Sequence, residues 1–194
     1  AYQVDPGLAS GGTGAGPAIT EYINHGGCNY GLTVDKNCVV WLAMIWSPGP
    51  GGYGCVRWDP PLTAGNPLNG WTYSNAGAPA QGRGIGIDFN NDVWMACNDG
   101  ANSAVKFSNT PVPNVLGVYP TPSPVPVGIG PASDGNIIVT PSGASNWSKL
   151  NVSTGAVISL PGPQLVGFGP YTYSDFTGSG QAMNNVVQGN WTVV

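Results

Sequence analysis

The sequence predicts an all-β fold built from short antiparallel strands, and three observations support this prediction. Glycine (31 residues) and proline (19 residues) are abundant in the 194-residue chain, so turns should be frequent. Aromatic residues make up 10% of the chain, which is not typical of low-complexity, disordered sequences. In addition, one segment recurs along the chain at a regular spacing. The length accommodates one domain or a short array of repeats.

The recurring segment is an apolar strand that contains glycine, followed by a turn rich in Asp or Asn and by a second apolar strand. The stretch YGLTVDKNCVVW (30–41) aligns without gaps with RGIGIDFNNDVW (83–94). Looser copies are VGIGPASDGNIIV (127–139) and VGFGP (166–170). Their first glycines lie about 53, 44 and 39 residues apart. These glycines are Gly31, Gly84, Gly128 and Gly167.

A repeat of this length matches one propeller blade, because four short strands and their turns need about 40 to 50 residues. The third strand of each unit is expected in GCVRWDP, SAVKFSN and WSKLNVSTG. The outer strand is expected in ITEYI, GWTYS, VLGVYP and AVISLP. We therefore predict a β-propeller-like repeat of about four blades, three of them clear and the fourth truncated.

Several of these motifs resemble the virginiamycin B lyase-like family of β-propellers, within a broader group that includes NHL-repeat and SMP-30 lactonase propellers. The resemblance rests on ITEY ahead of YGLTVD and VVW, on GCVRWDP, and on GIGID with DVWMA, and it covers residues 18–178. The closing PYTYSDFTG resembles the last-blade segment of secreted bacterial members. Such propellers usually close with about six or seven blades, so the resemblance implies a shortened form. Two arrangements fit the sequence. The blades could close into a ring, or they could form an open stack whose free sheet edges recruit other chains.

Three segments are expected along the chain. Residues 1–17 form a Gly-rich N-terminal segment, residues 18–180 the repeat domain, and residues 181–194 a strand-like C-terminal tail. The tail contains NNVVQGNWTVV, which carries no charge. We expect it to pair with the edge of a neighbour's sheet.

Charged residues make up only 7% of the chain, against roughly 25% in an ordinary soluble domain. Five basic residues are too few and too scattered to bind a nucleic acid. No apolar run of about 18 residues is present, so we expect no membrane span. The neutral composition favours packing against further copies of the chain, in a homo-oligomer or polymer. The N-terminus is typical of a mature end after signal-peptide cleavage, which predicts a secreted protein, outside the cell or at its surface.

The four cysteines lie in the first half of the chain and lack the CxxC spacing of redox and zinc sites. Two disulfides in a secreted protein are the favoured prediction, and their pairing is open. Buried free thiols are the alternative. The cysteines are Cys28, Cys38, Cys55 and Cys97.

Acidic residues in the repeat turns are the candidate ligands for a divalent metal, Ca²⁺ or Mg²⁺. Asp35 and Asp88 occupy equivalent repeat positions, although Ala132 takes this position in the third unit. Asp88, Asn90 and Asp92 have the alternate spacing of a calcium loop. The favoured alternative is an Asx-type hairpin turn, in which these side chains bond nearby backbone N–H groups. We therefore expect no bound cofactor.

Catalytic residues do not carry over from the resemblance. The lyase chemistry that it implies needs histidines and an acid around a magnesium ion, whereas this chain has one histidine, His25. Trp41 and Trp94 recur at equivalent positions and are expected in the core. Candidate glycosylation sites are Asn146, Asn151 and Asn190, each in a sequon.

These observations predict a non-catalytic extracellular structural module, which is a subunit of a filament or surface layer and assembles through its edge strands. A lyase- or lactonase-like enzyme with a metal in its channel is the first alternative. A carbohydrate-binding propeller with exposed aromatic side chains is the second.

Overall fold

The computed structural model describes most of the first three repeat units. The described residues are 2–4, 19–21, 28–37, 39–46, 54–58, 71–74, 81–98, 100 and 102–158. Of these, 2–4, 19–21, 28–29, 46 and 71–74 are described by their backbone alone. The predicted fourth unit at 166–170 and the predicted tail at 181–194 lie outside the described residues, as do His25 and Asn190.

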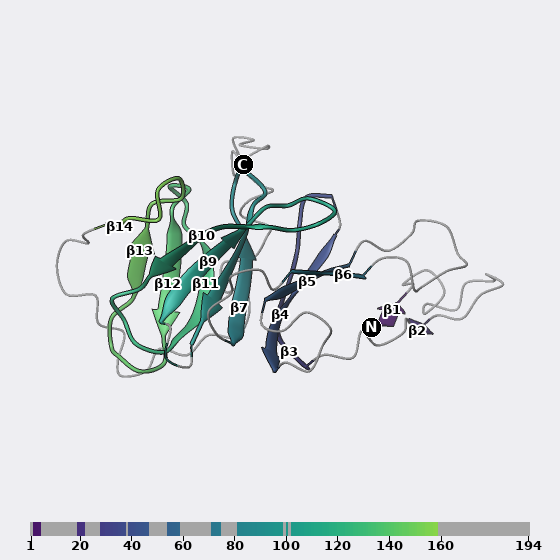
Figure 1. Ribbon diagram of the computed structural model, residues 1–194, viewed down its shortest axis with the longest axis horizontal. Helices are drawn as coiled ribbons and strands as arrows, with labels where there is room; N and C mark the ends of the chain where they lie inside the picture. The colour runs from purple at the N-terminus through teal and green to yellow at the C-terminus, as the bar shows by residue number, and fades with distance from the viewer. Residues whose placement is uncertain are drawn as a thin grey trace, which may run out of the picture.

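Three antiparallel sheets follow one another along the chain, and in each of them consecutive strands are neighbours (Figure 1). Blade 1 consists of β3 (Cys28–Val34), β4 (Val40–Trp46), β5 (Cys55–Trp58) and β6 (Trp71–Ser74). Blade 2 consists of β7 (Gly82–Ile87), β8 (Val93–Cys97), β9 (Ser103–Phe107) and β10 (Val115–Pro120). Blade 3 consists of β11 (Pro126–Pro131), β12 (Ile137–Pro141), β13 (Ser148–Leu150) and β14 (Val157–Ile158).

The predicted all-β, propeller-like repeat is confirmed, since each sheet corresponds to one predicted unit. The expected outer strands GWTYS, VLGVYP and AVISLP contribute β6, β10 and β14. The segment ITEYI, also expected as an outer strand, instead contributes β2 (Ile19–Glu21), which pairs with β1 (Tyr2–Val4) in a separate two-stranded sheet. No helix that is long and apolar enough to span a membrane occurs in the part of the chain that the structure describes.

The first strands of the blades approach each other closely at glycines. A Cβ atom on Gly31 of β3 would lie 2.5 Å from the carbonyl oxygen of Arg83 on β7. A Cβ atom on Gly86 of β7 would lie 3.0 Å from the carbonyl oxygen of Ile129 on β11. A side chain at either position would push neighbouring blades apart. Close packing of the first strands therefore requires glycine at these two positions.

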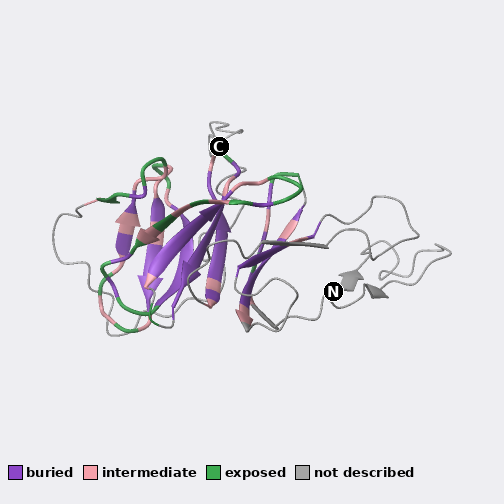
Figure 2. Cartoon of the chain, viewed as in Figure 1, coloured by how far each residue is buried: buried purple, intermediate pink, exposed green. Residues whose placement is uncertain are grey.

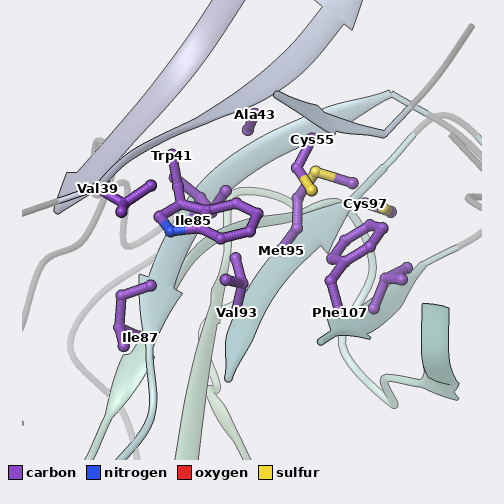
Figure 3. Close-up of a cluster of buried hydrophobic side chains, with 11 residues drawn as sticks. Val39, Trp41, Ala43, Cys55, Ile85, Ile87, Val93, Met95, Cys97 and Phe107 are labelled. Atoms are coloured by element: carbon purple, nitrogen blue, oxygen red, sulfur yellow. The ribbon is translucent and has the colours of Figure 1, made fainter. Parts of the chain in front are cut away.

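Two apolar layers hold the blades together, because alternate residues of each strand point to opposite faces of its sheet. Between blades 1 and 2, Trp41 and Ala43 of β4 pack with Val93 and Met95 of β8 (Figure 3). The neighbouring residue on β8, Trp94, faces the other way. The layer between blades 2 and 3 consists of Trp94, Ala96, Ala104, Ile129, Ile137, Val139 and Leu150. Exposure is concentrated in the turns and along the outer strands (Figure 2).

Candidate functional site

The turn between the first two strands of blade 2 is organised by the carboxylate of Asp88, which is buried directly after β7. Its Oδ1 accepts hydrogen bonds from the backbone N–H groups of Asn90 and Asp92, each at 2.9 Å. Its Oδ2 accepts a hydrogen bond from the indole N–H of Trp94 at 2.9 Å. One side chain thus fixes the turn and orients a core tryptophan. The Asx-type turn, expected as the alternative to a metal loop, is present.

Asp35 forms the same arrangement in blade 1. Its Oδ1 accepts hydrogen bonds from the backbone N–H groups of Asn37 at 2.8 Å and Val39 at 3.0 Å. Its Oδ2 accepts one from the indole N–H of Trp41 at 3.2 Å. Blade 2 adds a further donor, the side-chain amide of Asn109, at 2.6 Å from the same oxygen. Both repeats therefore use an aspartate six residues before a tryptophan to hold the hairpin.

A lysine occupies the space beside the carboxylates of blade 2. Lys106 lies opposite Trp94 across β8 and β9, and its Nζ is 2.9 Å from Asp92 Oδ2 and 3.3 Å from Asp88 Oδ2. The same Nζ is 5.3 Å from the centroid of the Trp94 ring and donates a hydrogen bond of 3.2 Å to the carbonyl oxygen of Val152 in blade 3. Burial alone would lower the pKa of Lys106, but the hydrogen bonds and charges of Asp92 and Asp88 outweigh it and raise the pKa. The charged ammonium group therefore links blades 2 and 3.

The predicted metal ligands either bind other groups of the protein or face the solvent. These ligands are Asp35, Asp88, Asn90 and Asp92. Asp35 belongs to the turn of blade 1, and Asn90 is exposed. Asp88 and Asp92 both bind the ammonium group of Lys106, which a divalent ion in that place would have to displace. No group of three His, Cys, Asp or Glu side chains suited to a metal occurs within the described ranges. The metal assignment stays a prediction, and the hydrogen bonds favour a structural role for these residues.

Blade 3 lacks this arrangement although it keeps the strand register. Ile138 lies opposite Lys149 across β12 and β13, in the register that pairs tryptophan with lysine in blade 2. Ala132 takes the place of the aspartate and offers no acceptor. Lys149 instead forms an ion pair with Asp134 of the turn, and its hydrogen bond lowers the pKa of that exposed carboxyl group.

A second polar cluster lies at the other end of the inner strands, near the starts of β3 and β7. The guanidinium carbon of Arg83 is 5.1 Å from the centroid of the Tyr30 ring. Arg83 Nη2 is 3.5 Å from Gln81 Oε1, and the Gln81 carbonyl oxygen accepts the backbone N–H of Asn98 at 3.1 Å. Two buried atoms, Arg83 Nε and Asn98 Oδ1, have no hydrogen-bond partner in the described part of the chain. Both atoms are buried, and buried polar atoms without a partner are rare in folded proteins.

Sequence reasoning missed Arg83, Asn98 and Lys106. A signal for Lys106 was present, because the third strand of every unit carries one basic residue, which is Arg57 in blade 1 and Lys149 in blade 3. The guanidinium carbon of Arg57 lies 5.9 Å from the ring centroid of the core tryptophan of its own blade, as expected for an equivalent position. A sequence signal for Arg83 was present too. It lies directly before a repeat glycine, at a position that carries no charge in the other units.

Cys55 of β5 and Cys97 of β8 are free thiols in the apolar layer between blades 1 and 2 (Figure 3). Burial raises the pKa of both thiols, that of Cys97 to about 12. No disulfide occurs among the side chains that are described, and those of Cys28 and Cys38 lie outside this set. The predicted disulfides are therefore not shown here. For Cys55 and Cys97 the structure has the alternative arrangement, buried and protonated thiols of low reactivity.

Two of the three candidate glycosylation sites fall on described residues. Asn146 is exposed in the loop between β12 and β13, where its Oδ1 lies 3.3 Å from the hydroxyl group of Ser123. Asn151 is half-buried, and its Oδ1 accepts hydrogen bonds from the backbone N–H groups of Ser153 and Thr154 in the turn before β14. Both assignments stay predictions.

Comparison with known proteins identifies the fold through structure rather than sequence. No protein family and no curated protein matches the sequence. A catalytically inactive virginiamycin B lyase from Staphylococcus aureus, solved with quinupristin, matches with a TM-score of 0.54 and 20% identity over 75% of this chain. A streptogramin B lyase matches with a TM-score of 0.52 and 22% identity, again over 75% of this chain. A gluconolactonase from Xanthomonas campestris matches with a TM-score of 0.52 and 11% identity over 76% of this chain.

These matches cover 45%, 46% and 52% of the respective structures, so the chain spans about half the length of the propellers that it resembles. At such low identity the likeness is one of fold. The resemblance to virginiamycin B lyase-like propellers is confirmed at the level of the fold.

Proposed function

We propose that this chain is a non-catalytic extracellular structural module that assembles with further copies of itself, as a subunit of a filament or surface layer, by pairing the edges of its sheets. The observation that supports self-assembly most directly is the outer edge of blade 2. The outermost strand, β10, carries no charge and exposes Leu116 and Val118. Uncharged, apolar edge strands are typical sites at which a further strand adds to a sheet.

The non-catalytic part of the proposal is supported by the bonds of the two repeat aspartates. Asp35 and Asp88 are the acidic residues at equivalent positions of the inner strands, and each uses both carboxylate oxygens to hold a turn and a tryptophan. A carboxylate that accepts several hydrogen bonds from its own turn is not free to act as a base or to bind a metal. The extracellular location is supported by composition alone, since charge is scarce and a neutral surface suits a packed layer.

Sedimentation velocity and negative-stain electron microscopy test the proposal. The intact chain should form particles or fibres whose size grows with protein concentration. A chain without residues 184–194 should form fewer of them, if the tail supplies one of the paired strands. Monomers at every concentration in both forms would contradict the proposed assembly.

Binding of a small ligand is a second candidate, favoured by the unpaired atoms at the other end of the inner strands. Arg83 Nε is a donor and Asn98 Oδ1 an acceptor, so a ligand with a carboxylate or carbonyl oxygen and a hydroxyl group could satisfy both. Gluconate and its lactone meet this description, and calorimetric titration of each measures their binding. Arg83→Gln should weaken binding. Lys36→Gln should not, because Lys36 is an exposed residue in the turn between β3 and β4, at the opposite end of these strands. Equal binding by both variants would exclude this cluster as the site.

Carbohydrate binding by exposed aromatic rings has no comparable support. The large apolar side chains that are exposed in the described residues are all aliphatic. They are Leu32, Val112, Leu116, Val118, Val125 and Val157.

A further inference from the structure

The outer edge of blade 2 is the longest described sheet edge on the rim of the molecule. β10 has six residues, whereas the corresponding outer strands β6 and β14 have four and two. On its inner side β10 pairs with β9, and on its outer side no described strand pairs with it. Among the described residues, the backbone N–H and C=O groups along that side have no strand partner, which leaves them suited to pair with a strand of another chain.

Side chains hold β10 in place before any partner arrives. The ring of Tyr119 stacks on that of Trp94, with centroids 5.4 Å apart and an angle of 28° between the planes. Val115, the first residue of β10, packs against the apolar layer between blades 1 and 2. An edge that is already ordered loses little conformational entropy when a second strand binds to it.

The exposed face of β10 is apolar. Leu116 is 53% exposed and Val118 is 42% exposed, and they alternate with the half-buried Val115, Gly117 and Tyr119. Natural edge strands are commonly protected by lysine or another charged residue, but no charged residue occurs between Lys106 and Asp134. Nothing in β10 would repel a second neutral strand.

Prolines limit where pairing can occur. Pro113 precedes β10 and Pro120 ends it, and neither has a backbone N–H to donate. A partner strand can therefore form a regular ladder only along residues 115–119. The prolines at both ends of this five-residue window limit the registers that the pair can adopt.

We propose that β10 pairs in antiparallel orientation with β10 of a second copy of this chain, about a two-fold axis. The two blade 2 sheets then become one continuous sheet, and Leu116 of each copy lies opposite Val118 of the other copy on a single face. A second copy is the partner that best fits, because it brings an equally neutral strand with the same proline limits. The inference rests on the proposed self-assembly and names one of its contacts.

Val118→Lys tests the contact, with Val112→Lys as the matched control. Val112 is also exposed, at 65%, but it lies in the turn before β10. Sedimentation velocity should show the same dimer for the intact chain and for Val112→Lys. Val118→Lys should raise the dissociation constant at least ~10-fold, because like charges on paired strands repel each other. Far-ultraviolet circular dichroism should be the same for all three proteins.

Charge complementation separates this contact from any other. An equimolar mixture of Val118→Lys and Val118→Glu should regain the dimer, since opposite charges then lie diagonally across the two-fold axis, within reach of each other. Failure to regain it, or an unchanged dimer in Val118→Lys, would overturn the β10 contact and leave self-assembly through another surface standing. A monomeric intact chain would overturn self-assembly itself.

Discussion

Blades 2 and 3 have the same strand register but secure the turn after their first strand in different ways. In blade 2 the buried carboxylate of Asp88 binds two backbone N–H groups, a tryptophan and the ammonium group of Lys106. We call Asp88, Trp94 and Lys106 the buried clamp. In blade 3 the aspartate is replaced by alanine, and Lys149 pairs with an exposed carboxylate. A blade thus forms without the clamp, which in blade 2 fixes the turn and, through the hydrogen bond of Lys106 to Val152, also links the sheet to blade 3.

The largest effect should follow Asp88→Ala, which removes the acceptor at the centre of the clamp. The indole N–H of Trp94 and two turn N–H groups lose their acceptor, and Lys106 loses one of its two carboxylates. We expect a loss of about 3 to 5 kcal/mol in the free energy of unfolding, measured with urea. Asp134→Ala in blade 3 should cost about 0.5 kcal/mol or less, because its ion pair is exposed. Similar losses in the two blades would contradict the distinction between them.

Lys106→Met should have the next largest effect. The change keeps the length and apolar part of the side chain but leaves Asp88 and Asp92 as neighbouring carboxylates without a cation. We expect a loss of about 2 to 4 kcal/mol, against about 0.5 kcal/mol for Lys149→Met in blade 3. If urea unfolding gave equal values for the two lysines, the ammonium group would not link blades 2 and 3.

Trp94→Phe should be milder, because a ring remains in the core and only the indole N–H is lost. The expected loss is about 1 to 2 kcal/mol, and Trp41→Phe in blade 1 should give a similar value. A double-mutant cycle of Trp94→Phe with Asp88→Ala measures the hydrogen bond itself, with an expected coupling of about 1 kcal/mol. Strictly additive changes would mean that the 2.9 Å contact between these residues contributes nothing.

The smallest effect concerns alkaline pH. The folded protein raises the pKa of Lys106 above its ordinary value of 10.5, so the clamp's contribution is complete below that pH and is lost as the pH rises through the folded pKa. The stability difference between the intact protein and Lys106→Met should therefore shrink above pH 10.5. A difference that stayed constant between neutral pH and pH 11.5, or about one unit above the ordinary value, would show that the charge of Lys106 is unimportant.

The strands of the three blades could be predicted from the sequence because their signals are local. Glycine in the first strand, an Asx turn and alternating apolar residues recur in each unit, and β8 and β9 follow directly from them. The clamp could be predicted only in part. Asp88 and Trp94 lie six residues apart in one hairpin, but Lys106 reaches them only through the register of β8 with β9.

Contacts between blades could not be predicted at all, since they depend on how sheets pack. Cys55 and Cys97 enter one apolar layer from different blades, and neither sequence spacing nor cysteine count indicates this. The same holds for Arg83 and Tyr30, whose contact at 5.1 Å requires β3 and β7 to lie side by side. Sequence periodicity therefore predicts the strands of one blade, whereas the packing of neighbouring blades determines which polar groups of that blade stay unpaired.

The acidic turn residues Asp35 and Asp88 bind groups of the protein, and we predict that no metal ion takes their place. Thermal unfolding in excess EDTA and in excess Ca²⁺, combined with elemental analysis of the purified protein, tests it most directly. The clamp predicts midpoints that agree within about 1 °C and no stoichiometric metal, because a bound ion would add stability by mass action. A midpoint several degrees lower in EDTA, with that difference abolished in Asp88→Ala, would contradict the claim.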